Sequence, residues 1–462
     1  MRGFRMSEQK RTLIFINLII TSFSSSLLAT AMVVALPHIA ADLNVSLSTG
    51  QWVTSGFALA SAIVMPLSAY LITRIPTKRL YMGGLVLIII GLSICAAAQT
   101  FSAMIAGRVI QAVSGGILGA MSQVILLTIY PRDKHGTIMG WYGMAMGFGP
   151  VIAPTISGIL MDLHSWRLVF MVTVALMVLS LIFALLTFDN FLTTTSAKFD
   201  VPSFTLSAFA FGGITLGFGN ITNYGIADLF SFVPLLIGLV TIVVFIKRQL
   251  SMNTPFLRVQ LLKNRTFALA VISVMLHSFV MQGSAILTPT LVQTVYHYSA
   301  TQTGLFMLIP AIVFAAVSPV AGKIYDKLGI RVLYMLSSVL LFLSSFAMAI
   351  ATEEMPIILV MLIYALRNGA LAMLMMPFIT WGMSTVSKEL YAQGTAVMNT
   401  FKNVSGAIGS AVVVGFMGVV TQLTAASPHA LMYGFNGAFA FVGVFTIFMM
   451  VIAVFFVKPG KN

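Results

Sequence analysis

Long apolar runs separated by short polar connections make up most of the chain. A run of about 20 apolar residues is long enough to cross the hydrocarbon core of a bilayer as one α-helix. Backbone groups cannot stay unpaired in hydrocarbon, so such runs are expected to be helical. We predict an all-α, polytopic membrane protein with about fourteen spanning helices, near residues 13–37, 52–72, 80–98, 102–130, 137–160, 167–188, 203–221, 230–246, 266–295, 303–322, 332–351, 356–384, 392–422 and 432–457.

Composition agrees with this pattern. The 462 residues are 59% hydrophobic and only 8% charged, which excludes an ordinary soluble domain. The first apolar run is too long for the hydrophobic region of a signal peptide, so no cleavage is expected. The single cysteine, Cys95, excludes a disulfide within one chain.

Basic residues fall in alternate connections between the expected helices. The two tails and the even-numbered connections hold 21 of the 25 Lys and Arg residues. Because basic loops stay in the cytoplasm, we expect both termini there. The formal charge of +14 is then mainly an orientation signal and a contact with anionic lipid, and nucleic-acid binding is not expected.

The sequence also contains an internal repeat. Residues 66–78 (PLSAYLITRIPTK) align with residues 319–331 (PVAGKIYDKLGIR), each at the end of an expected helix. Repeated halves are common in transporters, with the substrate site between them near the middle of the membrane. We expect a six-helix half over residues 1–188, a linker with two extra helices over 189–250, and a second six-helix half over 251–462.

The stretch from residue 140 to 158 (GWYGMAMGFGPVIAPTISG) is apolar but unusually rich in glycine and proline. Small residues four apart let another helix approach closely, and a Gly-Pro pair bends a helix at a fixed depth. The pattern is typical of a hinge between moving halves; an ordinary packed helix with incidental glycines is the alternative. The candidate hinge positions are Gly140, Gly147, Gly149, Pro150, Pro154 and Gly158.

These hinge positions resemble the fifth-helix motif of drug:proton antiporters in the major facilitator superfamily. Further matches to the fourteen-helix branch include ALPHIAADL (35–43), AGRVIQ (106–111) and TPFLRVQLLKNRTF (254–267). The resemblance runs nearly end to end. It implies two pseudo-symmetric six-helix halves with two helices between them, and proton-coupled export by alternating access.

The chain departs from the family pattern in its fifth-helix motif, where Ala153-Pro154 replaces the usual Gly-Pro or Gly-Gly, and also in its first helix and its first-half loop. In the first helix, Leu28 and Val33 stand where the family has Asp and Asn; in the first-half loop, Thr73 and Pro76 replace the usual Asp and Gly. The second half keeps the family's loop signature, which implies a cytoplasmic gate there. Its residues are Gly322, Asp326, Lys327, Gly329 and Arg331.

None of the eleven acidic residues falls inside an expected spanning segment. Ionisable groups within the membrane mark proton or substrate pathways, and here they are cationic or neutral. Arg108 matches the family's RxxQG motif, except that Ala112 replaces the Gly, and the resemblance implies a role in proton coupling; a structural Arg bonded to carbonyls is the alternative. His277 is a candidate proton carrier because it titrates near neutral pH, or else a neutral His bonded to a carbonyl. Asp42 is a third candidate, or only a loop charge.

Other polar residues within the apolar runs are candidates for the substrate cavity. They are Gln111, Gln293, Arg367, Asn399 and Lys402. A cavity that holds cations and no carboxylate should disfavour purely cationic drugs and accept anionic, zwitterionic or neutral amphiphiles. The alternative is that these cations face backbone carbonyls between helices.

The sequence lacks the motifs of ATP-driven and hydrolytic proteins. It has no GxxxxGK[ST] phosphate loop, no HExxH and no GxSxG. We therefore expect no enzyme, no metal and no cofactor other than protons as the coupling ion. The main hypothesis is a monomeric, proton-coupled multidrug efflux antiporter of the cell membrane, whose partners are small amphiphilic substrates and membrane lipids. The alternatives are an exporter or flippase of an endogenous anionic or zwitterionic amphiphile or lipid, and a non-transporting receptor or scaffold.

Overall fold

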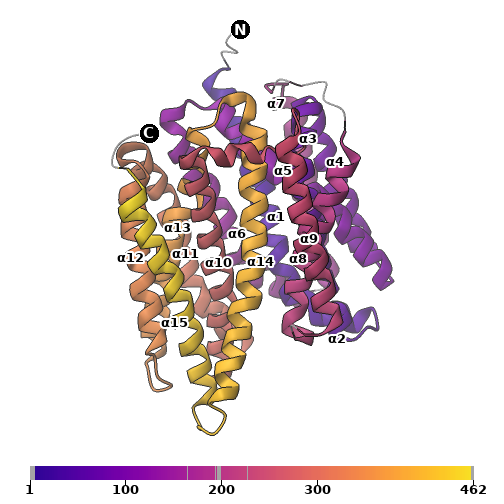
Figure 1. The fold of residues 1–462 in the computed structure, drawn as a ribbon. Helices are drawn as coiled ribbons and strands as arrows, with labels where there is room; N and C mark the ends of the chain where they lie inside the picture. Colours follow the sequence, from indigo (N-terminus) through magenta and orange to yellow (C-terminus); the bar gives the residue numbers. More distant parts are fainter. Residues whose placement is uncertain (1–5, 164, 193, 195–198, 226, 459–462) are drawn as a thin grey trace.

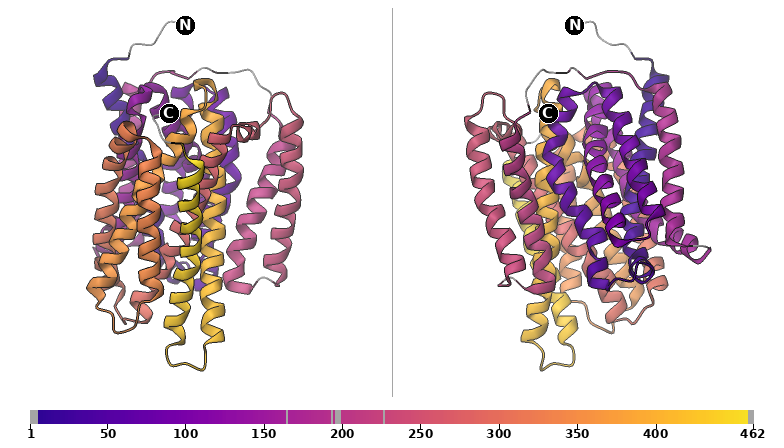
Figure 2. Two further views of the ribbon diagram at one scale, coloured as in Figure 1. Left: turned by 60° about the vertical axis from the view of Figure 1, so that its left-hand side comes forward. Right: turned by 90° about the vertical axis from the view of Figure 1, so that its right-hand side faces the viewer.

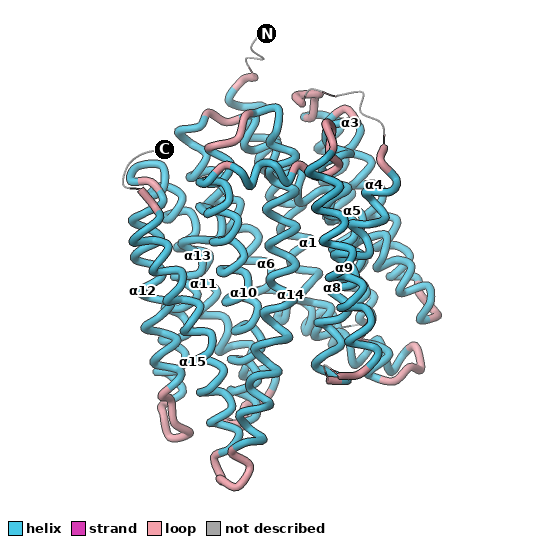
Figure 3. Tube along the Cα trace, in the orientation of Figure 1, coloured by secondary structure: helices cyan, strands magenta, loops and turns pink. Residues whose placement is uncertain are grey.

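The computed structural model describes residues 6–163, 165–192, 194, 199–225 and 227–458. Within these ranges the chain forms fifteen α-helices, four short 3-10 or π turns and no strand (Figure 3). The predicted all-α class is confirmed. In the order of the chain, the helices are α1 (Glu8–Asp42), α2 (Leu47–Gly50), α3 (Trp52–Arg74), α4 (Thr77–Ala97), α5 (Phe101–Ile129), α6 (His135–Leu163), α7 (Trp166–Thr187), α8 (Val201–Tyr224), α9 (Leu229–Ser251), α10 (Arg265–Thr294), α11 (Ala300–Leu328), α12 (Ile330–Ala349), α13 (Ile357–Ser384), α14 (Tyr391–Leu423) and α15 (Ala430–Val451).

Thirteen helices are long and apolar enough to cross a membrane within the described residues. The remaining long helix, α6, has 29 residues, and several of its side chains lie outside the description. With α6, the helices correspond one to one to the fourteen expected runs. The helix ends differ most at α1, which starts at Glu8 because the Ser7 side chain caps it through the Lys10 amide. The one-turn helix α2 is not signalled by an apolar run.

Both ends of the described chain lie on one side of the molecule, which we call the terminal side (Figure 1). The other side is called the far side. Helices α1 and α3 to α7 pack mainly among themselves, and so do helices α10 to α15. The two groups meet where α6 packs on α11 and α13, and where α14 packs on α3 and α5. This arrangement has the two six-helix halves that the sequence predicts.

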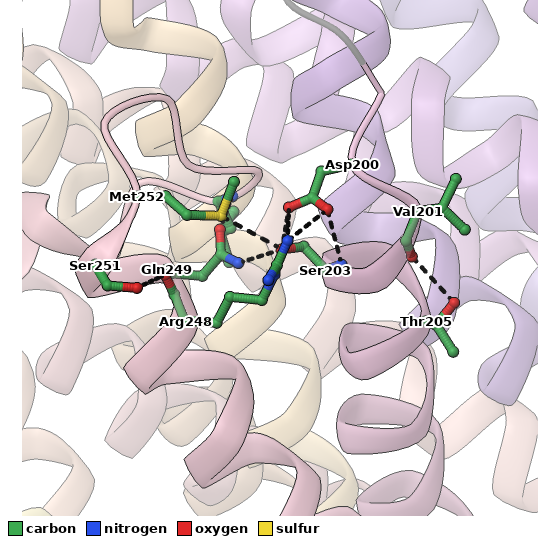
Figure 4. Close-up of polar contacts among 9 residues, drawn as sticks. Asp200, Val201, Ser203, Thr205, Arg248, Gln249, Ser251 and Met252 are labelled. Carbon is green, nitrogen blue, oxygen red and sulfur yellow. Dashed lines mark hydrogen bonds and ion pairs between the residues drawn. The ribbon is translucent and has the colours of Figure 1, made fainter.

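The extra pair α8–α9 stands at one edge of the molecule (Figure 2). Helix α8 contacts α3 of the first half and α14 of the second half. The pair therefore covers a seam between the halves. Its terminal-side ends are held together by a polar cluster in which Arg248 binds Asp200 at 3.0 Å and Gln249 donates to Ser203 at 2.7 Å (Figure 4).

Candidate transport gate and polar groups at depth

The closest meeting of the two halves is the crossing of α6 with α11 on the terminal side. A Cβ added at Gly322 would fall far inside van der Waals contact with the Gly136 carbonyl oxygen, and one added at Gly140 would lie 2.7 Å from the Ser318 carbonyl oxygen. The Ser318 hydroxyl donates to the Gly140 carbonyl at 2.9 Å. The absence of side chains at these glycines is what lets the two backbones touch.

Asp326 joins the end of α11 to the start of α6. Its carboxylate accepts hydrogen bonds from the Gly136 and Thr137 amides, both at 2.7 Å, and from the Thr137 hydroxyl at 2.6 Å. The first amides of a helix have no partner within the helix, and the helix dipole makes its N-terminus positive. A carboxylate placed there satisfies the amides and the dipole together, so Asp326 clamps the two halves at the terminal side.

Two further contacts close the same side. The Asn399 amide of α14 donates to the Gln123 amide oxygen of α5 at 3.0 Å. The Arg132 guanidinium, just before α6, donates to the Val386 carbonyl at 3.2 Å, just after α13. These bonds join the halves toward the terminal side, so the structure is that of a terminal-side-closed conformation.

The sequence difference at the matching loop of the first half is accompanied by different contacts among the described residues. The Thr73 hydroxyl donates to carbonyls of its own helix, at Ala69 and Tyr70, and Pro76 begins α4 without a side-chain cap. In the second half, Gly329 adopts φ 76° and separates α11 from α12, a conformation that favours glycine. Arg331 donates to the Val454 carbonyl at 3.4 Å, and Lys327 is exposed. The loop geometry thus differs between the halves as the sequence suggests, while the gating role stays a prediction.

The candidate hinge glycines of α6 face two ways. Gly140 and Gly147 lie against Ser318 and Phe314 of α11, whereas Gly149 lies against α1, where an added Cβ would be 2.9 Å from the Leu27 amide nitrogen. Helix α6 is therefore in close contact with both halves at different depths. Pro150 lies in the same helix, while the surroundings of Pro154 and Gly158 fall outside the described side chains. The hinge role itself is not tested by the geometry.

Arg108 is buried within the first half. Its Nε donates to the Val53 carbonyl at 2.9 Å, its Nη1 donates to the Gln111 side chain at 2.8 Å, and its guanidinium lies 4.3 Å above the Phe57 ring. Gln111 donates in turn to the Cys95 sulfur at 3.1 Å. Carbonyl and aromatic partners are what a cation needs at depth when no carboxylate is near. These contacts are those of a structural Arg bonded to carbonyls, the alternative given above, and a role in proton coupling stays a prediction.

His277 and Arg367 are buried in the second half. The His277 Nε2 lies 2.9 Å from the Leu371 carbonyl of α13. Arg367 donates to the Ser345 hydroxyl at 2.6 Å and to the Ser284 hydroxyl at 3.0 Å. His277, Arg367 and their partners all lie on α10, α12 and α13, so these contacts hold helices of the second half together.

The remaining candidates lie in different surroundings. Lys402 is partly exposed on α14, one turn beyond Asn399. Asp42 is exposed at the far-side end of α1 and forms an ion pair with Arg167 at 2.6 Å. Gln293 is exposed near the far-side end of α10. The structure therefore brings Lys402 and Asn399 together and separates Asp42 and Gln293 from them.

Carboxylates are absent from the buried part of the molecule as far as the structure describes it. Ten of the eleven acidic side chains are described, Asp162 being the exception, and none of the ten is buried. The expectation that the interior lacks acidic groups is met over these ten residues. The described residues also hold no group of three or more His, Cys, Asp or Glu that could bind a metal ion.

The model of the Major Facilitator Superfamily matches residues 18–410. The chain belongs to the major facilitator superfamily. It is 32% identical to the lincomycin resistance protein LmrB of Bacillus subtilis, over 99% of this chain and 98% of that protein. It is equally similar to an uncharacterized transporter of this superfamily from the same organism, YcnB, over 98% of this chain and 97% of that protein. With the multidrug export protein EmrB of Haemophilus influenzae it shares 25% identity, over 86% of this chain and 79% of that protein. The resemblance to multidrug efflux members of the superfamily is confirmed.

Solved structures of the superfamily share the fold. The human organic anion transporter MFSD10 superposes with a TM-score of 0.68 at 12% identity, covering 97% of this chain and all of that chain. The proton:xylose symporter XylE gives the same TM-score at 14% identity, covering 99% of this chain and 98% of that chain. At these identities the similarity establishes the architecture of two helical halves and nothing about substrates.

The sequence did not predict the hydrogen-bond partners of several candidate residues. Gln123 was not singled out, although an amide in an apolar helix is a signal of interhelical hydrogen bonding. Its bond to Asn399 joins positions 276 residues apart in the chain, and no local pattern pairs them. The partner of Asp326, the start of α6 at Gly136 and Thr137, was likewise not specified by the motif.

Proposed function

We propose that the protein exports amphiphilic, drug-like compounds across the bacterial plasma membrane in exchange for protons, by alternating access. The observation that carries this proposal is the terminal-side closure, in which Asp326, Gly322 and Asn399 join the two halves. Two halves that touch at one side must separate there to load a substrate from that side. Near full-length similarity to LmrB, a lincomycin resistance protein, supports drug export as the outcome.

The proposed orientation places the terminal side in the cytoplasm. Most Lys and Arg residues lie in the tails and in the connections that reach this side, and basic connections stay in the cytoplasm. In this orientation the structure is closed to the cytoplasm, the state from which a substrate leaves outward. Breaking the Asp326 clamp is then the step that readmits substrate from inside.

Proton coupling is assigned to the buried polar groups because no described carboxylate is buried. Arg108 is the first candidate, since its guanidinium bridges α3 and the Gln111 side chain of α5. Loss of the guanidinium would remove the hydrogen bonds to Val53 of α3 and to Gln111 of α5, and so change the packing of the first half. His277 is the second candidate because it can accept a proton and links α10 to α13. Asp42, already paired with Arg167, is the weakest of the three.

A pH-gradient-driven efflux assay in proteoliposomes tests the proposal. Lincomycin and a fluorescent amphiphile serve as substrates, and wild type is compared with Arg108→Ala, Arg108→Lys and His277→Ala. We expect wild type to pump only with the gradient, Arg108→Ala to lose gradient-driven transport, and Arg108→Lys to keep part of it. Wild type that moves substrate equally without the gradient contradicts coupling. Undiminished gradient-driven transport by Arg108→Ala contradicts the assignment of Arg108.

A further inference from the structure

The cationic and histidine side chains within the spanning helices differ in whether residues of their own half form hydrogen bonds with them. Arg108 and Arg367 donate to carbonyl, amide or hydroxyl oxygens of the same half, and His277 meets the Leu371 carbonyl. The Lys402 ammonium has no hydrogen bond or ion pair with any residue that the structure describes. It is also partly exposed, whereas the other three are buried.

Lys402 lies well inside the long apolar helix α14. It is eleven residues from the start of α14 at Tyr391, which corresponds to about 16 Å along the helix axis, against a hydrocarbon thickness of about 30 Å. An unpaired charge at that depth costs at least about 2.5 kcal/mol. The Lys402 ammonium therefore needs a counter-charge, which no described residue of the neighbouring helices supplies.

Lys402 lies directly beyond the contact between the halves. One turn before it, Asn399 donates to Gln123 of the first half. One turn after it, Gly406 packs against Ser278 and Gln282 of α10, and Gln282 is exposed. The partly exposed Lys402 side chain is therefore carried by a helix that joins the halves, one turn beyond their terminal-side closure.

We propose that Lys402 binds the carboxylate of an amphiphilic substrate. This inference rests on the proposed export function and names the substrate class. Because none of the ten described acidic side chains is buried, nothing nearby neutralises Lys402 or attracts a purely cationic drug. A carboxylate supplies the missing counter-charge and gains a charge-assisted hydrogen bond.

A matched pair of probes tests this assignment on the full-length protein. Dansyl-labelled undecanoic acid and its methyl ester differ in charge and hardly at all in size, and binding to protein in phosphatidylcholine nanodiscs is followed by dansyl fluorescence. We expect wild type to bind the acid at least about tenfold more tightly than the ester, as for a desolvated charge pair. Lys402→Gln should remove this preference by weakening the acid alone. Lys402→Arg should retain most of the preference, and the exposed control Lys247→Gln should change nothing.

Three outcomes overturn the assignment. The acid preference persists in Lys402→Gln, or acid and ester weaken together, or phosphatidylglycerol in the nanodiscs abolishes the acid preference of wild type and so assigns the ammonium to a lipid head group. Gradient-driven efflux of the ester separates this inference from the proposed function. If Lys402→Gln still pumps the ester while the acid preference is gone, the assignment of Lys402 and the proposed export function both stand. If wild type binds the acid with this preference but pumps neither probe, the export function fails and the site remains.

Discussion

Asp326 illustrates how one carboxylate can control a conformational equilibrium. Its two oxygens accept hydrogen bonds from two amides and one hydroxyl at the start of α6, and hydrogen bonds to charged groups contribute about 1.5–3 kcal/mol each, net of the bonds to water that they replace. The carboxylate is only half-buried, so water can replace these bonds when the halves part. The clamp is strong enough to bias the closed state and weak enough to open.

Asp326→Asn should shift the protein toward opening at the terminal side. The amide keeps one acceptor oxygen but places an NH2 group against the amides and the positive end of the α6 dipole. A cysteine at Met376, which is buried beside Gly143, reports the opening in a Cys95→Ser background. We expect a membrane-impermeant maleimide added at the terminal side to react several-fold faster in Asp326→Asn. An unchanged rate contradicts the clamp; Asp133→Asn, an exposed carboxylate near the same helix, is the control.

At the residue scale, sequence analysis predicted chemical types better than partners. Lys402 was recognisable because a charge within an apolar run is rare, and Asp326 because it belongs to the loop signature that the second half keeps. Whether Arg108 bonds to Val53 depends on how α3 and α5 pack, which composition does not determine. Asp42 was a coupling candidate from its place at a helix end, and only the fold shows its pairing with Arg167.

At the scale of single helices, α11 shows that glycines within one helix have different roles. Gly322 lies where α6 and α11 touch, whereas nothing lies within 4 Å of a Cβ added at Gly304 of the same helix. Both residues are followed by helical sequence, and neither position needs a positive φ. Close approach, not backbone freedom, is therefore what requires glycine at position 322.

Gly322→Ala should weaken terminal-side closure and slow export, because the added methyl group overlaps the Gly136 carbonyl and only a separation of backbones relieves it. We expect gradient-driven efflux to fall by about tenfold, as for an overlap costing more than about 1.4 kcal/mol. Gly304→Ala is the matched control and should transport like wild type. Equal transport by the two variants contradicts a contact role for the α6–α11 crossing.

The α8–α9 pair depends on the polar cluster at its terminal-side end (Figure 4). Partial burial raises the pKa of Asp200, but hydrogen bonds from Ser203 and the Arg248 guanidinium outweigh it and hold the pKa below its ordinary value. A carboxyl whose pKa is lowered by folding stabilises the folded state at pH values above its unfolded pKa. That contribution is lost as the pH falls through the lowered pKa, below about pH 4.

Asp200→Asn should therefore lower the melting temperature at pH 7 by an amount equivalent to about 1 kcal/mol, since Arg248 is partly exposed and the pair is screened. The difference from wild type should shrink as the pH falls below about 4, where wild type also loses the charge. Thermal unfolding in detergent at both pH values measures it. A difference that is independent of pH would contradict the ion pair, and Glu354→Gln, at an exposed position, should show no effect at either pH.

For the whole molecule, the sequence predicted the architecture well. Apolar run length and alternating loop charge determine helix number, and the repeat at residues 66–78 and 319–331 indicates two halves. The closed side could not be predicted, because closing contacts such as that of Asn399 with Gln123 join residues far apart in the chain. The one-turn helix α2 and the seam covered by α8 also depend on packing rather than on local pattern.

In the transport cycle proposed for this protein, the two halves rock so that the closure alternates between the terminal side and the far side. Spin labels at Lys134 and Lys388 on the terminal side, and at Gln99 and Glu354 on the far side, occupy exposed positions in opposite halves. Pulsed electron paramagnetic resonance on a Cys95→Ser background measures both distances with and without substrate and a pH change. Alternating access predicts that the terminal-side distance lengthens as the far-side distance shortens. If both distances stay fixed or change in the same direction while efflux proceeds, the two halves do not rock in this way.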